Sequence, residues 1–576
     1  MLHTRTLAAA AASMLILAAC GRDDTFIDSG VDNDLLAHVP AGTPYLSANL
    51  QPIPDEIIDS YLQRAQPVLD VLQRELTSTR QALASAPTSD HSLDPVILAL
   101  VNEFDGKLNR SGLEELGLDL QAPRALYGMG AFPVFRMGLS DATRLRATIQ
   151  RILDAGGIAA PQLDHQGTGY WRLPASDDTG AGRGGAIYIA ILDNQLTIGI
   201  FPASLESELL PHLLGQSMPA ESDAAERLQA INERQGYTPY GTGSFDLLAL
   251  TDELFSSESV SGRALMDAGI DVSTQLGPMC REEIRQIVSQ APRVHSGLTE
   301  LTSDSVGYEL VVEAEPGLAA ELAGLVARVP QADPDSVGVL EFALGLKVGA
   351  LRDFLRGRTA AVAEAPYRCQ HLQELNDAAR KMYTQLNQPI PPLVNNFEGL
   401  RISLNRLGSN PAQAEQVEGV MAIHVEQPEM FVGMAQMFLP DLAALQLTPG
   451  APPARLPASM IPLPGVVAFA ALSDSAIGLS VGAGEEARLA DYLDEDSEPG
   501  GTFLSMNYDT ETYLEYTDRF SDQMAQFQAG PDEEPGPIHG LAEAARQAYK
   551  AMAGRTDTRM SFSEEGIHIT SRMTFK

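Results

Sequence analysis

The chain has 576 residues, of which 76 are acidic and 39 are basic, and its formal net charge is −37. This length exceeds what one hydrophobic core normally serves, so we expect two or more domains. The negative charge is interrupted by no basic stripe and repels phosphate backbones, which argues against nucleic acid as a partner.

An apolar run from Leu7 to Leu17 follows a short head that carries Arg5. The run is too short to span a bilayer, which needs about 20 residues, and its features predict a secretory signal peptide over residues 1–19. It closes with Leu17-Ala18-Ala19-Cys20, which resembles the lipobox of bacterial lipoproteins. The resemblance implies acylation of the Cys20 thiol and attachment to a membrane by that lipid. The alternative is an ordinary cleavage site with an incidental cysteine.

The acidic stretch at 20–37 lacks periodicity and is predicted to be a flexible tether. In Gram-negative lipoproteins an aspartate after the cysteine favours retention at the inner membrane. Here Gly21 follows, so the resemblance implies a cell-envelope protein at the outer membrane, facing the periplasm. No later segment has the roughly 18 uninterrupted apolar residues of a membrane span, so the lipid is expected to be the sole attachment.

The first half of the body begins with a turn-rich segment, Pro40-Ala41-Gly42-Thr43. This segment resembles a turn found in uncharacterised secreted bacterial proteins, and the resemblance implies no activity. The elements predicted after it, in chain order, are a strand at 45–50, helices from Pro54 and over 93–108, a hairpin of 125–130 with 134–138, a helix over 141–155, a hairpin of 186–192 with 196–200, a helix over 204–214, and strands at 244–248 and 306–314.

The second half of the chain has a similar order of predicted elements. The predicted elements are strands at 340–346, 400–404 and 419–425, a helix over 430–438, a hairpin of 466–472 with 476–481, a helix over 485–493, a strand at 502–507, and a closing hairpin of 559–563 with 566–575. The order predicts an α+β fold of two similar halves, 38–329 and 338–576, each with antiparallel hairpins and paired helices, that arose by internal duplication. A Pro- and Asp-rich linker at 329–337 is expected between them. Two unrelated α+β domains are the alternative.

Two cysteines remain besides Cys20, namely Cys280 and Cys369. Since an exported protein meets an oxidising compartment, we expect a disulfide that links the halves. In the loop-entropy model a closed loop of roughly 90 residues stabilises the fold by about 4–5 kcal/mol before strain. Two separate buried thiols are the alternative.

Three short motifs suggest catalysis only weakly. Gly478-Leu479-Ser480-Val481-Gly482 fits the G-x-S-x-G pattern, but Ser480 is predicted to lie inside a hairpin strand and the βαβ alternation of that hydrolase fold is missing. Cys369 with His371 would suggest a thiol nucleophile and its base, although the predicted disulfide uses the same sulfur. The Gly-rich loop at 180–185 lacks the Lys-Ser/Thr pair of a phosphate loop.

The sequence predicts no metal or cofactor. The ten histidines are scattered, and the acidic runs at 494–496 and 532–534 lack the Gly-centred loop of a high-affinity calcium site. Two functions remain: a non-enzymatic lipoprotein that binds an envelope protein, lipid or polymer, and a periplasmic hydrolase with a site assembled from distant residues. The absence of a catalytic motif favours the first. An exposed apolar patch would support it, whereas a close nucleophile–base pair in a cleft would support the second.

Overall fold

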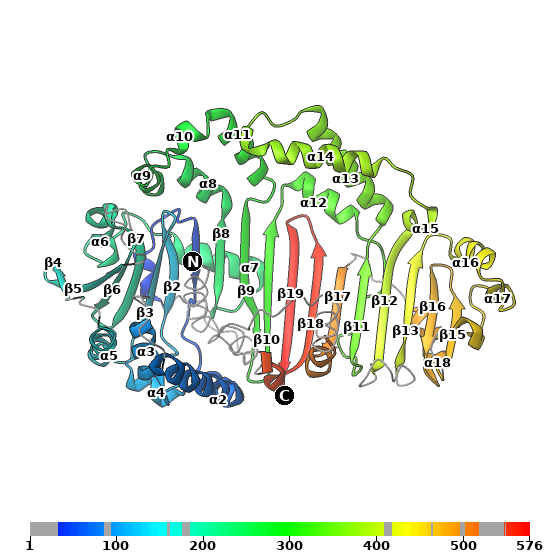
Figure 1. The fold of residues 1–576 in the computed structure, drawn as a ribbon, viewed down its shortest axis with the longest axis horizontal. Helices are drawn as coiled ribbons and strands as arrows, with labels where there is room; N and C mark the ends of the chain where they lie inside the picture. Colours follow the sequence, from blue (N-terminus) through cyan, green and yellow to red (C-terminus); the bar gives the residue numbers. More distant parts are fainter. Residues whose placement is uncertain are drawn as a thin grey trace. The chain divides into compact units, whose positions relative to one another are not determined.

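The computed structural model describes residues 33–85, 94–157, 160, 162–174, 185–407, 417–461, 465–495, 502–517, 546–547 and 549–576. The predicted signal peptide, Cys20 and most of the tether lie outside the described residues, as do the loop at 175–184 and the acidic run at 532–534. The described chain is α+β, with helices and antiparallel strands, as predicted (Figure 1). No helix among these residues is both long and apolar enough to cross a membrane.

The chain divides into two compact units. Unit 1 comprises Met1–Leu310, Glu533–Met552 and Phe575–Lys576, and unit 2 comprises Val311–Asp532 and Ala553–Thr574. The division falls before the segment at 329–337 that was expected to be a linker.

Unit 1 is built on an antiparallel sheet with the strand order β4-β5-β6-β7-β3-β2-β1-β8-β9, and β10 pairs with β9. Its strands are β1 (Tyr45–Ala48), β2 (Arg124–Met129), β3 (Phe132–Gly138), β4 (Leu163–His165), β5 (Thr168–Pro174), β6 (Gly185–Leu192), β7 (Gln195–Pro202), β8 (Thr242–Asp246), β9 (Arg293–Leu301) and β10 (Ser305–Glu313), of which the residues from Val311 on belong to unit 2. Both predicted hairpins, β2–β3 and β6–β7, are confirmed.

The helices of unit 1 include α5, which Asp141 caps through its carboxylate as predicted. They are η1 (Asp34–His38), α2 (Asp55–Ser85), α3 (Asp94–Phe104), α4 (Arg110–Glu115), α5 (Ala142–Ala155), η2 (Ala203–Leu205), α6 (Glu206–Leu213), α7 (Ala224–Gln235), α8 (Leu247–Phe255), α9 (Val260–Asp267), α10 (Val272–Gln275) and α11 (Pro278–Val288). The main core combines Leu46, Tyr127 and Val134 of the sheet with Leu213 of α6 and Leu228 of α7.

Unit 2 has a similar succession of paired strands without a counterpart of β4, in the order β14-β15-β16-β13-β12-β11-β17-β18, with β19 paired to β18. The strands are β11 (Leu340–Gly345), β12 (Phe397–Arg406), β13 (Glu418–Val425), β14 (Ala454–Arg455), β15 (Ala468–Leu472), β16 (Ala476–Val481), β17 (Thr502–Asp509), β18 (Ala553–Phe562) and β19 (Gly566–Phe575). The helices are α12 (Pro316–Gly324), α13 (Val348–Glu364), η3 (Gln370–Leu372), α14 (Gln373–Leu386), α15 (Pro392–Asn395), α16 (Pro428–Phe438), α17 (Pro440–Ala443), η5 (Ala458–Met460) and α18 (Glu485–Asp494).

A matching helix cap supports the correspondence of the two strand orders. β8 ends at Asp246, whose carboxylate accepts a hydrogen bond from the backbone N–H of Ala249 (2.7 Å). β17 ends at Asp509, whose carboxylate accepts one from the N–H of Thr512 (2.9 Å). In both units a carboxylate three residues earlier satisfies an N–H of the first helical turn. This cap places Leu247 and Leu248 in α8, whereas the sequence pattern predicted them in the strand.

A buried arginine binds helix carbonyls in each unit. Arg136 on β3 donates from Nη2 to the carbonyl oxygens of His212 (3.2 Å) and Leu213 (2.8 Å), where α6 ends. Arg401 on β12 donates from Nη1 to the carbonyl of Tyr492 (2.9 Å), near the end of α18. The last carbonyls of a helix lack partners within the helix and carry its negative dipole end, so a guanidinium stabilises them.

The two arginines occupy opposite members of similar cross-strand pairs. Arg136 on β3 faces Ala125 on β2, whereas Arg401 on β12 faces Ala422 on β13. In each pair an arginine lies opposite an alanine. The small alanine side chain leaves room for one guanidinium, which can come from either of the two paired strands. Each arginine also has a histidine nearby, the half-buried His38 in unit 1 and the buried His424 in unit 2. Burial, and then the positive charge of the arginine, lowers the pKa of His38 and that of His424 to about 4.

Replacing Arg136 with Met should destabilise unit 1, because it leaves the α6 carbonyls and the Tyr127 hydroxyl without their donor. We expect a loss of about 2–4 kcal/mol in the free energy of unfolding, measured by urea denaturation. The control is Arg144→Met, which removes an exposed guanidinium paired with Asp141 and should change stability by less than about 1 kcal/mol. Equal effects of the two substitutions would contradict this role of Arg136.

Candidate functional site

The central strands of unit 2 bury their polar side chains. Ser403 on β12 and Asn507 on β17 each lie directly cross-strand from Glu341 on β11. All three are buried, with Glu341 only 6% exposed. A strand that alternates polar and apolar side chains normally exposes its polar side to water. Here that side is the interior one, and it is called the polar face below.

Hydrogen bonds satisfy the polar face around Glu341. Its Oε1 accepts hydrogen bonds from the hydroxyls of Ser403 (2.5 Å) and Ser336 (3.0 Å). The Ser403 hydroxyl in turn accepts one from Arg488 Nη2 (2.6 Å) on α18, and Arg488 is paired with Glu485 (2.7 Å). Burial raises the pKa of Glu341, although the two hydroxyls and the arginines Arg488 and Arg401 oppose the shift.

The segment that was expected to be a linker is hydrogen-bonded to this polar face. The Asn507 amide donates to the carbonyl oxygens of Asp333 (3.0 Å) and Pro334 (2.5 Å), and the Ser505 hydroxyl accepts from the N–H of Ala332 (2.8 Å). Arg559 on β18 also donates to the Gln331 side chain (3.1 Å). The sheet therefore holds this Pro- and Asp-rich segment by its backbone groups.

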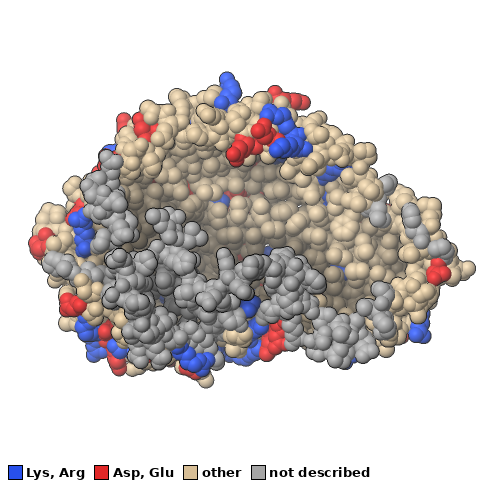
Figure 2. All heavy atoms as spheres, viewed as in Figure 1, with Lys and Arg blue, Asp and Glu red and all other residues tan. Residues whose placement is uncertain are grey.

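The opposite side of the same strands carries almost only apolar side chains, all of which are partly exposed. We call it the apolar face: Leu340, Phe342 and Leu344 of β11, Leu400, Ile402 and Leu404 of β12, Met421 and Ile423 of β13, Ile477 and Leu479 of β16, and Leu504 and Met506 of β17. Figure 2 shows mostly uncharged atoms over β11, β12 and β13. Partial exposure of so many adjacent aliphatic residues is unusual for a surface that has no partner.

Unit 1 distributes its side chains differently. At the pairs that correspond to Glu341 and Ser403, its sheet has Leu46 on β1 and Tyr127 on β2, both 1% exposed in the main core. Its opposite face carries the exposed side chains of Leu126, Ile200 and Phe245. Unit 1 therefore has an apolar pair at the position where unit 2 buries Glu341 and Ser403, although it buries other polar side chains, such as Arg136 and Thr197, on the same side of its sheet.

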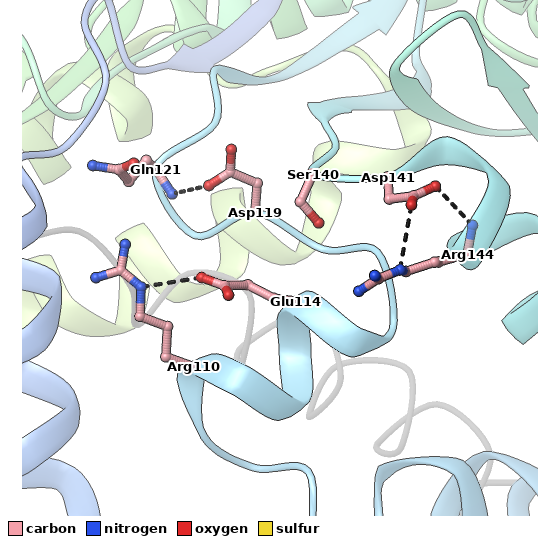
Figure 3. Close-up of a pocket in the computed structure, with 7 residues that line it drawn as sticks. All are labelled: Arg110, Glu114, Asp119, Gln121, Ser140, Asp141 and Arg144. Atoms are coloured by element: carbon pink, nitrogen blue, oxygen red, sulfur yellow. Dashed lines mark hydrogen bonds and ion pairs between the residues drawn. The ribbon is translucent and has the colours of Figure 1, made fainter.

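A polar depression of about 350 Å³ lies on unit 1 (Figure 3). It is lined by Arg110, Glu114, Asp119, Gln121, Ser140, Asp141 and Arg144. Four of its charged groups form ion pairs, Arg110 with Glu114 (3.2 Å) and Arg144 with Asp141 (3.3 Å), and the Asp119 carboxylate accepts a hydrogen bond from the Gln121 N–H (2.9 Å). Because these exposed pairs satisfy each other, the depression offers no unmatched group to a ligand.

The candidate catalytic residues are not brought together. Ser480 lies within β16, in the hairpin with β15 as predicted, and its fully buried hydroxyl has no hydrogen-bond partner in the described structure. Cys369 is buried just before η3, and Cys280 is buried within α11. Among the described residues, no group of three His, Cys, Asp or Glu side chains is placed to hold a metal.

One serine–histidine contact was missed by the sequence reasoning. The Ser563 hydroxyl and His568 Nε2 lie 2.8 Å apart at the turn between β18 and β19. The same hydroxyl accepts a hydrogen bond from the Glu565 N–H (3.0 Å), and Ser563 N–H bonds the Gly566 carbonyl (2.8 Å). These bonds are those of a hydroxyl that closes its own tight turn.

No protein-family model, curated protein or solved structure matches this chain. The argument for function therefore depends on the geometry of the chain itself.

The burial of Glu341 predicts a pH dependence for unit 2. Since its pKa is raised in the folded state, the folded chain binds more protons than the unfolded one between the two pKa values. Stability should therefore fall as the pH rises through that interval. Glu341→Gln, which mimics the protonated acid, should gain stability relative to the wild type as the pH is raised above the ordinary pKa of a glutamate, measured by urea denaturation. Glu321→Gln, at an exposed carboxylate paired with Arg358, is the control, and an equal change there would contradict the prediction.

The disulfide between Cys280 and Cys369 stays a prediction. Intact oxidised protein, alkylated under denaturing conditions without reductant, should show neither thiol modified by mass, and reduction should expose both. Two alkylated thiols before reduction would favour separate buried cysteines instead.

Proposed function

We propose that this protein is a non-enzymatic lipoprotein of the cell envelope that binds an apolar ligand on the apolar face of unit 2. The observation that carries the proposal is the inward turn of the polar side chains, which leaves the aliphatic side of the sheet partly exposed. A sheet that only needed to fold would bury its aliphatic side and expose its polar side. The reverse arrangement is expected where an apolar surface is kept for a partner.

Simple energetics support an apolar ligand. Each methylene transferred from water to such a face stabilises the complex by about 0.8 kcal/mol, so a long alkyl group can overcome the free-energy cost of association. The central rows contain neither a charged side chain nor a nucleophile: the row through Phe342 and Ile402 continues with Met421 and Leu479. Such a surface suits binding better than catalysis.

The leader supports the envelope location. Leu17-Ala18-Ala19-Cys20 would anchor the chain by acylation of Cys20, and a stable anchor needs more than one acyl chain. With a formal charge of −37, the chain has little electrostatic affinity for anionic lipid.

The two units are proposed to derive from an internal duplication. This is supported by the common strand order, by the caps at Asp246 and Asp509, and by the buried arginines that bind the last carbonyls of α6 and α18. After duplication, the two units would have diverged at the central pair, which is Leu46 with Tyr127 in unit 1 and Glu341 with Ser403 in unit 2.

Substitutions in the apolar face should weaken ligand binding. Ile402→Thr with Met421→Thr keeps strand-compatible side chains but removes aliphatic area at the centre of the face. We expect at least about a fivefold loss of affinity for a fluorescent apolar probe, measured by titration. Met437→Gln, at a methionine on α16 that is 73% exposed, is the matched control and should leave affinity unchanged. Equal affinity in all three proteins would refute binding at this face.

Replacing Cys20 with Ala tests the anchor. The variant should leave the membrane fraction and appear as soluble protein in the periplasm or as retained precursor, because the acylated thiol is gone. Its body should keep the urea unfolding transition of the wild type. Retention in the membrane fraction after a high-salt wash would show that another attachment exists.

A further inference from the structure

The apolar face ends in a small group of charged residues, where β11 continues towards α13. Glu398 precedes Leu400 and Ile402 on β12, at a register shift between Phe397 and Gly399, and its carbonyl accepts a hydrogen bond from the N–H of Leu346 (2.8 Å). Lys347 comes next on that neighbouring segment and is exposed. Glu426 directly follows β13, and its N–H bonds the carbonyl of Asn396 (3.0 Å).

These three charges lie close enough to influence one another. Burial, and then the Glu426 carboxylate, raises the pKa of Glu398, while the Lys347 ammonium opposes the shift. Within the described chain no cation forms an ion pair with Glu398 or Glu426. The end of the apolar face therefore presents two carboxylates and one ammonium, with a net negative charge that a cationic group would complement.

The aliphatic side chains of the apolar face favour an acyl chain over a peptide as the ligand. An extended peptide laid on it would lose water from amide groups that the aliphatic side chains cannot hydrogen-bond, which opposes binding. An acyl chain has no such groups. Measured along the strands from this charged end, the six residues of β11 extend roughly 20 Å, a length comparable with an extended long acyl chain.

We propose that the occupant is a membrane phospholipid whose zwitterionic head group ends in a primary ammonium. Its acyl chain would lie on the apolar face, its ammonium would contact Glu398 and Glu426, and its phosphate would contact Lys347. A phospholipid without the ammonium would place its phosphate beside two uncompensated carboxylates. The inference rests on the proposed function, since it names the ligand class of the same face.

The test compares two lipids that differ only in the head group. Palmitoyl lysophosphatidylethanolamine and palmitoyl lysophosphatidylglycerol, each below its micellar concentration, compete with the fluorescent apolar probe on the mature chain. The wild type should prefer the ethanolamine lipid by about three- to tenfold, as expected for a partly exposed charge pair. Glu398→Gln with Glu426→Gln should reduce this ratio to near one. Lys347→Met should weaken both lipids alike, and Glu429→Gln on α16 should change neither.

The outcomes separate this inference from the proposed function. If the wild type prefers the glycerol lipid, or if the double variant keeps the full preference, the head-group assignment is overturned. If neither lipid competes although the probe still binds, the lipid is not the occupant, and the function as an apolar-ligand binder stands. If the probe also binds Ile402→Thr with Met421→Thr as tightly as the wild type, the proposed function fails as well.

Discussion

The hydrogen-bonded polar interior of unit 2 is the constraint on which its other features depend. Burying a carboxyl group, an amide and several hydroxyls costs free energy unless each finds a partner. Glu341 is satisfied by Ser336 and Ser403, and Asn507 by the backbone of the segment that crosses it. The partners come from different elements, so the sheet, α18 and the 329–337 segment must be in place together. Once they are, the strand alternation leaves the aliphatic side chains on the other face, and the candidate site results from it.

Different side chains fill the space between sheet and helices in the two units. In unit 1 the stacked rings of Tyr188 and Phe201, 4.1 Å apart, and the leucines of α6 and α7 fill the space under the sheet. In unit 2 the main buried apolar cluster lies under α18, where Leu489 and Leu493 close on Val420 and Ala422. Both arrangements still require a guanidinium to satisfy the carbonyls at a helix end, and Arg136 and Arg401 provide it from opposite strands.

An open aliphatic face can bind molecules of low solubility in water. Such a surface provides affinity without much specificity, because apolar contacts are not directional. Specificity must come from polar groups at its margin, and Glu398, Glu426 and Lys347 are the charged groups at one end of the face. The serine–histidine contact at Ser563 and His568 lies at a tight turn and is explained by the closure of that turn.

The sequence by itself determined where several of the strands and helices lie along the chain. Alternation and turn residues located the hairpins β2–β3, β6–β7 and β15–β16, and an acidic residue before an amphipathic run located α5, because these signals depend on local geometry. Alternation also shows that Glu341, Arg401 and Ser403 share one side of their strands. It does not show which side is buried, since that depends on the partners that cover it. Only the tertiary structure decided that the polar side faces inwards, because the groups that satisfy it come from α18 and from a segment that reads as a linker.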